Sequence, residues 1–166
     1  GGEGYGVAAG SDLIIKGGGK VEASSIEEAA IWADGNIDIS GGSQVEASSQ
    51  GDLAVDTEGS LAVTNASLDA SGVEYGVYAY KGVTLDHATV TVRTSASGGQ
   101  AIALITDGDD IVIKNGSIVD AFAEGKFSVA ISTRNHQPNV AGGHIYISDS
   151  VVKAIARYVE SGSDGP

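Results

Sequence analysis

The chain has 166 residues, of which 42% are hydrophobic and 5% aromatic, a length that fits one domain. It contains no cysteine, which excludes disulfides, thiolate metal ligands and cysteine nucleophiles. The 22 Asp and Glu residues outnumber the 9 Lys and Arg residues, giving a formal net charge of −13, and this excess argues against a nucleic-acid partner. We also expect no insertion into a membrane, because no long apolar segment is visible.

An internal repeat begins near the N-terminus, where residues 12–25 are echoed by residues 35–49. A first column of paired apolar residues, two positions apart, recurs at steps of 24, 24, 22, 28 and 34 residues. The side chain between them is often charged or polar, which is typical of a strand with one buried face. The pairs are Leu13/Ile15, Ile37/Ile39, Leu61/Val63, Val83/Leu85, Ile111/Ile113 and Ile145/Ile147.

Two further columns accompany the first. The second column keeps a nearly constant offset from the first, and each member of the third column lies six residues ahead of one of the first five members of the first column. The second column comprises Val21/Ala23, Val45/Ala47, Leu68/Ala70, Val90/Val92, Val119/Ala121 and Val152/Ala154. The third column comprises Val7/Ala9, Ile31/Ala33, Val55, Val77/Ala79 and Ile105. Each repeat therefore predicts three short strands and leaves no room for a long helix.

Equivalent strands of successive repeats should pair in parallel and stack their apolar side chains in columns. We therefore predict an all-β fold, a right-handed single-stranded parallel β-helix (β-solenoid) of about six coils over residues 1–160, followed by a tail or linker at 161–166. Gly and Asn punctuate the corners, where a positive φ is often needed. Since Gly4-Tyr5-Gly6-Val7 matches the internal Glu74-Tyr75-Gly76-Val77, we expect a piece of a longer chain.

The motif Gly-x-Ile-x-Ile-Ser-Gly-Gly-x-x-Val-x-Ala-Ser at residues 35–48 resembles the β-helix repeat regions of large surface or secreted proteins of Gram-positive gut bacteria. Such regions are often described as uncharacterised or carbohydrate-binding, and relatives with β-helix folds include calcium-dependent binders of acidic polysaccharide. The resemblance implies an extracellular or cell-surface location. It carries over no functional residue, because the repeat type is not an activity.

Outward positions of the third column gather aromatic side chains. Trp32, Asp56 and Tyr78 occupy equivalent positions, and Tyr80 follows two residues later. Rings two coils apart would lie about 10 Å from each other, a spacing that suits stacking on alternate sugars of an extended glycan. The alternative is that the rings cover an edge or a neighbouring domain. We expect Tyr5 and Tyr75 to be structural, because they fall in the inward phase or at corners.

Carboxylates gather at outward positions of the second column. Glu22, Glu46 and Asp69 fall in successive coils, followed by Thr91, Asp120 and Lys153. Like charges on neighbouring strands repel, so we expect a divalent cation such as Ca²⁺, raised pKa values or solvent screening to offset them. The alternative to a metal site is a solvated charged face.

Two insertions break the period. Asp107, Asp109 and Asp110 lie in a lengthened corner and are a second candidate for Ca²⁺, although the downstream Glu of known calcium loops is missing. An ordinary Asp-Gly turn is the alternative. The longer insertion, residues 134–143, carries Arg134 and His136 and is the one place where catalysis would be sought.

Taken together, these residues favour a non-catalytic extracellular module that binds a polysaccharide, host glycan or cell-wall glycan, or acts in adhesion. One alternative is a spacer without a binding site. Another is a polysaccharide lyase or hydrolase, although paired carboxylates at glycosidase spacing occur throughout an acidic ladder and specify nothing. We expect no required cofactor, with calcium as the candidate aid, and a monomer within a larger multidomain chain.

Overall fold

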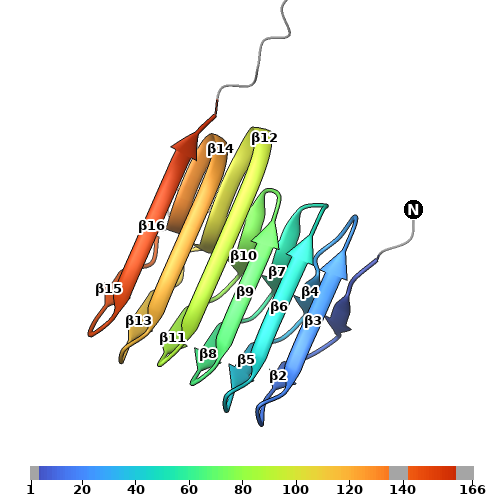
Figure 1. Cartoon of the computed structure of the whole chain (residues 1–166), viewed down its shortest axis with the longest axis vertical. Helices are drawn as coiled ribbons and strands as arrows, with labels where there is room; N and C mark the ends of the chain where they lie inside the picture. The colour runs from blue at the N-terminus through green and yellow to red at the C-terminus, as the bar shows by residue number, and fades with distance from the viewer. Residues whose placement is uncertain (1–3, 135–141, 160–166) are drawn as a thin grey trace, which may run out of the picture.

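The computed structural model describes residues 4–134 and 142–159, which form strands and turns with no helix. Consequently, no helix in the described ranges could cross a membrane. The strands wind as a solenoid in which each level, here called a rung, contributes to two parallel sheets (Figure 1). The prediction of a parallel β-helix is confirmed.

The first column of the sequence forms the 6-stranded sheet, in the order β15-β13-β11-β8-β5-β2. Its strands are β2 (Leu13–Ile15), β5 (Ile37–Ser40), β8 (Leu61–Thr64), β11 (Val83–Asp86), β13 (Ile111–Lys114) and β15 (Ile145–Ile147). Neighbours pair in parallel, and every apolar pair predicted for this column aligns with the next one.

The second and third columns together form the 10-stranded sheet. The strands of the second column are β3 (Lys20–Ser25), β6 (Gln44–Ser49), β9 (Ser67–Gly72) and β16 (Val151–Tyr158). Those of the third are β1 (Val7–Ala9), β4 (Ile31–Ala33), β7 (Leu53–Thr57) and β10 (Tyr75–Ala79). Two long strands, β12 (Thr89–Thr106) and β14 (Ile118–Thr133), serve both columns.

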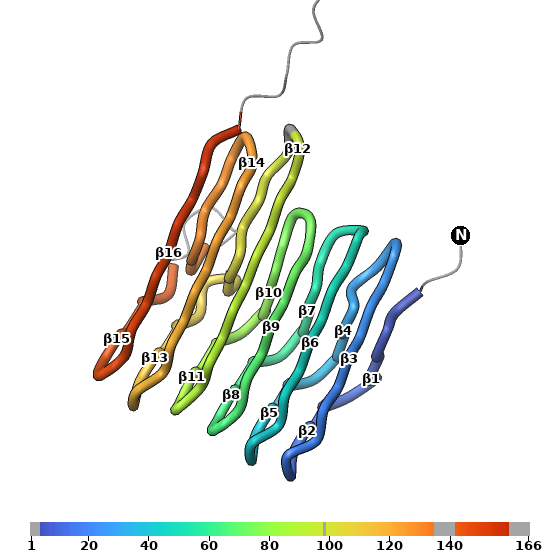
Figure 2. Tube along the Cα trace, viewed as in Figure 1, coloured from blue at the N-terminus to red at the C-terminus, as the bar shows by residue number. Residues whose placement is uncertain are grey.

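The long strands differ from the three short strands expected in every repeat. Figure 2 shows the trace of β12 and β14 reaching farther than the earlier rungs before it turns back. The two strands stay paired on both sides of a register shift between Ala96 and Gln100. Small residues permit this bend, since a Cβ on Gly125 would lie 3.0 Å from the Cβ of Ala101 and 3.1 Å from the Gly99 carbonyl oxygen.

The number of turns and the alignment of one strand differ from expectation. The solenoid makes about five turns, slightly fewer than the predicted six coils. In the third column, Val77 pairs with Leu104, and Ile105 pairs with Tyr78 instead of continuing the inward stack. The lengthened corner at Thr106 to Asp110 explains the one-residue displacement, because it adds chain between this strand and β13.

The core is a line of aliphatic side chains stacked between the sheets. Inward residues such as Ile39, Val63 and Leu85 are fully buried, whereas the residues between them are half-buried or exposed. Each stack removes apolar surface of both neighbouring rungs from water. Burial of this surface stabilises the fold by roughly 25 cal/mol per Å². Stability therefore comes from contacts between adjacent rungs, as in other solenoids.

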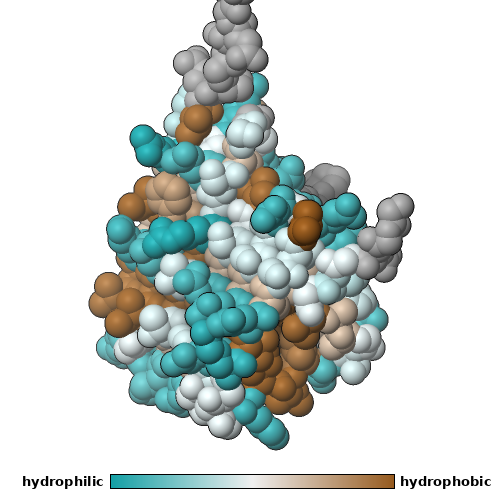
Figure 3. Space-filling model, turned by 45° about the vertical axis from the view of Figure 1, so that its right-hand side comes forward, coloured by the Kyte–Doolittle hydropathy of each residue, from teal (hydrophilic) through white to brown (hydrophobic). Residues whose placement is uncertain are grey.

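The corners between the first and second columns adopt the left-handed conformation that their Gly and Asn residues predicted. Gly41 and Gly42 have φ of 67° and 80°, and Asn65 and Asn115 have φ of 48° and 55° in later rungs. Corner hydroxyls also satisfy backbone groups, as when buried Ser49 donates to the Glu28 carbonyl oxygen at 2.7 Å. The surface outside these corners is mixed, with separate hydrophobic patches among hydrophilic residues (Figure 3).

Candidate functional site

The third column carries a surface that we call the aromatic face, made by Tyr5, Trp32, Asp56, Tyr75, Tyr78 and Tyr80. Trp32 on β4 pairs in register with Asp56 on β7, which pairs with Tyr78 on β10. Their neighbours in sequence, including Ile31 and Val77, are buried in the core. The alternation of faces along each strand therefore turns Trp32, Asp56 and Tyr78 outward, as predicted.

The rings of the aromatic face form two groups, one on each side of Asp56. Tyr5 stacks on Trp32 with ring centroids 5.4 Å apart and an interplanar angle of 25°. Tyr78 meets Tyr75 edge-on at 5.5 Å and Tyr80 at 5.7 Å. Tyr5 and Tyr75, which we expected to be structural, therefore both touch outward-facing aromatic residues.

Asp56 lies in a partly dehydrated position between the two ring groups. Burial, reinforced by the nearby Glu58 and Asp52 carboxylates, raises the pKa of Asp56 to about 6. Burial also raises the pKa of the Tyr78 phenol, so this hydroxyl remains protonated at neutral pH. The face thus offers one carboxyl group that titrates just below neutral pH, and phenol groups that donate and accept hydrogen bonds.

A second acidic row, not noticed in the sequence, borders the aromatic face. Burial raises the pKa of Asp52, and Glu74 and Glu28 add to this rise. The Asp52 Oδ1 atom is buried without a hydrogen-bond partner among the described residues. The three residues follow the same steps of 24 and 22 as the apolar columns, so the repeat could have revealed the row.

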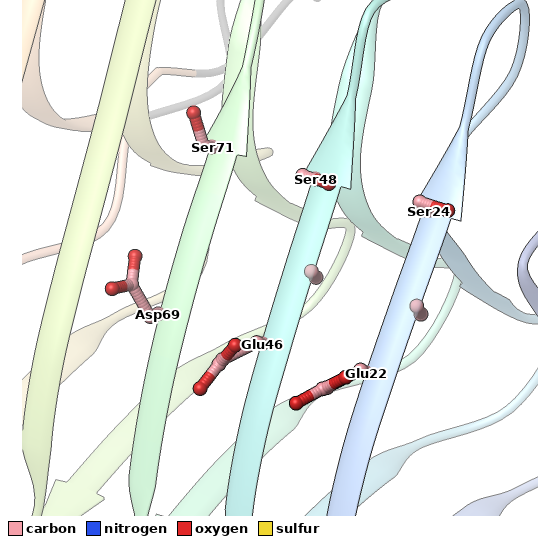
Figure 4. A pocket seen from close by; sticks show the side chains of 8 residues that line it. Glu22, Ser24, Glu46, Ser48, Asp69 and Ser71 are labelled. Atoms are coloured by element: carbon pink, nitrogen blue, oxygen red, sulfur yellow. The ribbon is translucent and has the colours of Figure 1, made fainter.

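The predicted ladder of Glu22, Glu46 and Asp69 is formed on β3, β6 and β9, in register. A parallel row of hydroxyl groups, Ser24, Ser48 and Ser71, lies beside it (Figure 4). Together with Ala23 and Ala47, the two rows line a shallow hollow of about 530 Å³. The polar side chains that line the hollow are carboxylates and hydroxyl groups, whereas Ala23 and Ala47 are buried residues of the core between them.

Lys20 offsets part of the repulsion in this ladder. Its ammonium group forms ion pairs with Glu22 and, at 3.5 Å, with Glu46. The hydrogen bond and the charge of Lys20 lower the pKa of Glu22, and the same contacts raise the pKa of Lys20. Lys20 lies two residues before Glu22 and therefore on the same face of the strand. The alternation of faces along a strand could have identified Lys20 as a partner of Glu22 from the sequence. Farther along, Arg93 pairs with Asp120 at 3.2 Å.

The calcium candidates are not drawn into one cluster. Across residues 4–134 and 142–159, no three His, Cys, Asp or Glu side chains form a group that could hold a metal ion. At the lengthened corner, Asp110 Oδ1 accepts the His144 amide at 2.7 Å, and the Asp109 carbonyl oxygen accepts the Thr106 hydroxyl. Asp107 adds a negative charge near Tyr78. Calcium binding by any of these residues stays a prediction.

The loop proposed for catalysis is only partly described. Arg134 is exposed at the end of β14, and His136 lies outside the described residues.

No protein-family model, curated protein or solved structure matches this chain.

Proposed function

We propose that this chain is a non-catalytic, extracellular module of a bacterial surface or secreted protein, and that it binds a glycan through the aromatic face. The observation that carries the proposal is the in-register row of Trp32, Asp56 and Tyr78 on three adjacent strands. Calcium is an optional aid through the acidic residues and is not part of the aromatic site.

The spacing of the row supports an extended ligand. Adjacent strands lie about 4.8 Å apart, so Trp32 and Tyr78 are separated by about 10 Å along the solenoid. Sugars of an extended chain could stack on these two rings while the sugar between them meets Asp56. Aromatic rings suit such a ligand because they combine an apolar face with a polar edge.

The contacts around the rings favour a prearranged site. Tyr5 supports Trp32 by stacking, and Tyr75 supports Tyr78 by an edge contact. Side chains that are already held lose less conformational entropy on binding. Tyr80, which is 46% exposed, extends the surface at one end.

The charge of the site favours neutral or amine-bearing glycans. Asp56, Asp52 and Glu58 surround the row with carboxyl groups, and ionised carboxylates accept hydrogen bonds from hydroxyl or ammonium groups. A uronate-rich polysaccharide would be repelled by these residues and by the net charge of −13, unless Ca²⁺ bridges the two.

The proposal is tested by retention of the protein on immobilised neutral, amine-bearing and acidic glycans, with and without millimolar Ca²⁺. We expect Trp32→Ala and Tyr78→Ala each to reduce retention at least tenfold. Tyr146→Ala is a matched control, because Tyr146 is 51% exposed on β15 in the other sheet. Circular dichroism verifies that each variant folds, and unchanged retention of folded Trp32→Ala and Tyr78→Ala would refute the site.

A spacer role is the second candidate. The continuous parallel ladders of both sheets favour it, because every rung is held to the next by backbone pairing. A spacer needs no ligand site, so failure to bind any glycan in the same experiment would support this alternative.

A further inference from the structure

Asp56 lies at the centre of the aromatic face without a positively charged neighbour. Its partners in the in-register row are Trp32 on one side and Tyr78 on the other. The charged groups that act on Asp56 are both carboxylates, those of Glu58 and Asp52. A half-buried carboxylate in such surroundings is stabilised when a cation binds beside it.

The basic residues of the described chain do not supply this cation. Arg134, directly after β14, acts on the Tyr75 phenol and not on Asp56. Within residues 4–134 and 142–159, the acidic partners of Lys and Arg all lie outside the aromatic face; they are Glu22, Glu46, Asp86, Asp120 and Glu124. The negative charge at Asp56 is therefore not cancelled by a described neighbour.

The supporting rings approach Trp32 and Tyr78 from directions that leave the position over Asp56 to a ligand. Tyr5 directly precedes β1, and β1 lies on the opposite side of β4 from β7. Tyr5 therefore stacks on Trp32 from the side away from Asp56. The rings that contact Tyr78 come from β10 itself or from the residue directly after it.

A cation over Asp56 would contact both rings of the row. Adjacent strands lie about 4.8 Å apart, so a charge over the middle strand lies about 5 Å from the rings on either side. This separation is within the distance of about 6 Å over which an aromatic face attracts an ammonium group, and the indole ring of Trp attracts it most strongly. The carboxylate below accepts hydrogen bonds from the N–H groups of the same cation.

We propose that the aromatic face selects glycans that carry an amino group, and that the ammonium group of the sugar lies over Asp56 between Trp32 and Tyr78. This inference rests on the proposed function and names its ligand class. The two rings hold the glycan chain, whereas Asp56 determines which glycan is accepted. A sugar whose amine is acetylated presents a neutral amide and leaves the carboxylate without a cation, so it binds more weakly.

Calorimetry with derivatives of one β-1,4-linked glucosamine hexasaccharide tests this selection. The N-acetylated form is neutral, the N,N,N-trimethylated form keeps its positive charge at every pH, and the free amine is only partly protonated near neutral pH. At pH 7 we expect the trimethylated form to bind at least tenfold more tightly than the N-acetylated form, with the free amine between them.

A pair of carboxylate variants tests the role of Asp56. Asp56→Asn removes the charge and keeps the shape of the side chain, so we expect it to lower the ratio of the two affinities at least fivefold. Asp38→Asn is the matched control, because Asp38 is exposed on β5 in the other sheet. Circular dichroism verifies that both variants fold. A ratio that Asp56→Asn leaves at its natural value would overturn the inference.

The pH profile of trimethylated hexasaccharide binding reports the same carboxyl group. Since the pKa of Asp56 is raised to about 6, its ionised fraction and the affinity should both fall about tenfold from pH 7 to pH 5. The other titratable groups on the elements around it are Asp52 and Glu58 beside β7, Asp34 after β4, Tyr75 and Tyr78 on β10, Tyr80 after β10, and Asp107 near Tyr78. We expect Asp56→Asn to abolish the fall. An equal fall in this variant would assign the titration to another of these groups and contradict the inference.

The outcomes separate this inference from the proposed function. Equal binding of the N-acetylated and trimethylated forms, with loss of both in Trp32→Ala and Tyr78→Ala, would overturn the selection of amines but leave glycan binding at the aromatic face intact. Binding of neither form would also overturn the inference, and the immobilised glycans then decide the proposed function separately. Oligolysine that binds more tightly than the trimethylated hexasaccharide would assign the face to a basic peptide and overturn the choice of a glycan.

Discussion

The middle and last rungs of this solenoid are built from the same sequence pattern, yet their side chains lie in different surroundings. Ile113 and Ile147 occupy equivalent positions in paired strands, but the first is fully buried and the second is 52% exposed. The difference comes from the neighbours, since Ile113 lies between two rungs and Ile147 has only one in the described structure. Burial in this fold is therefore a property of rung contacts, not of the residue pattern alone.

The outward faces of the same rungs differ in chemistry. The early strands β3, β6 and β9 carry acidic and hydroxyl rows. Later strands of the same sheet, β14 and β16, instead carry the exposed apolar residues Ile118, Val151 and Ile155. Inward positions repeat because packing requires it, and outward positions are free to vary. Function in this molecule is thus sought in the outward residues.

The largest expected effect compares Ile113 with Ile147. Ile113→Ala creates a cavity among stacked side chains and should lower the free energy of unfolding by about 2–5 kcal/mol. Ile147→Ala removes a half-exposed side chain and should cost less than about 1 kcal/mol. Urea unfolding followed by circular dichroism measures both changes, and equal losses would contradict the dependence on neighbouring rungs.

An intermediate effect concerns Asp56. Its pKa is raised to about 6 in the folded protein, so the folded state retains a proton that the unfolded chain releases near pH 4. Stability from this group is therefore lost as the pH rises from about 4 to 6. Asp56→Asn should remove this loss, and its stability relative to the natural chain should rise by on the order of 1–3 kcal/mol between pH 4 and pH 7.

Thermal unfolding of both proteins at pH 4, 5, 6 and 7 checks this sign. Glu58→Gln is the control, because Glu58 is exposed and acts on Asp56 only through its charge. A stability difference between Asp56→Asn and the natural chain that is the same at every pH would refute the burial of the carboxyl group.

The smallest expected effect concerns Lys20. Lys20→Gln leaves Glu22 and Glu46 without their shared cation, but these side chains are exposed, so stability should change little. If the ladder takes Ca²⁺, the variant should bind it more tightly than the natural chain does. Calorimetric titration with CaCl₂ measures this, and weaker calcium binding by Lys20→Gln than by the natural chain would contradict the expectation.

Much of the fold was predictable because its pattern is periodic. The spacing of Leu13/Ile15 and Ile37/Ile39 fixed which strands pair and which side chains face inward, and the observed register agrees. The displacement at Leu104 and the continuous strand β12 were missed, because an apolar run such as Ala101 to Ile105 permits two alignments. Only the pairing with β10 and β14 selects one.

The candidate site was predictable in position but not in contacts. The alternation of side chains along each strand predicted that Trp32, Asp56 and Tyr78 share one face, and the structure has them so. The stacking of Tyr5 on Trp32 depends on side-chain torsions and on the bend before β1, and neither follows from periodicity. The raised pKa of Asp56 likewise depends on burial that only packing determines.

The most direct test uses Trp32, the single tryptophan of the chain, as a reporter in a fluorescence titration with the oligosaccharides that the immobilised glycans identify. We expect a saturable change in Trp32 emission whose midpoint agrees with that of the binding heat measured by calorimetry. We expect both signals to be lost in Tyr78→Ala. Binding heat without any change in Trp32 emission would place the ligand elsewhere. Neither signal with any glycan would contradict glycan binding itself.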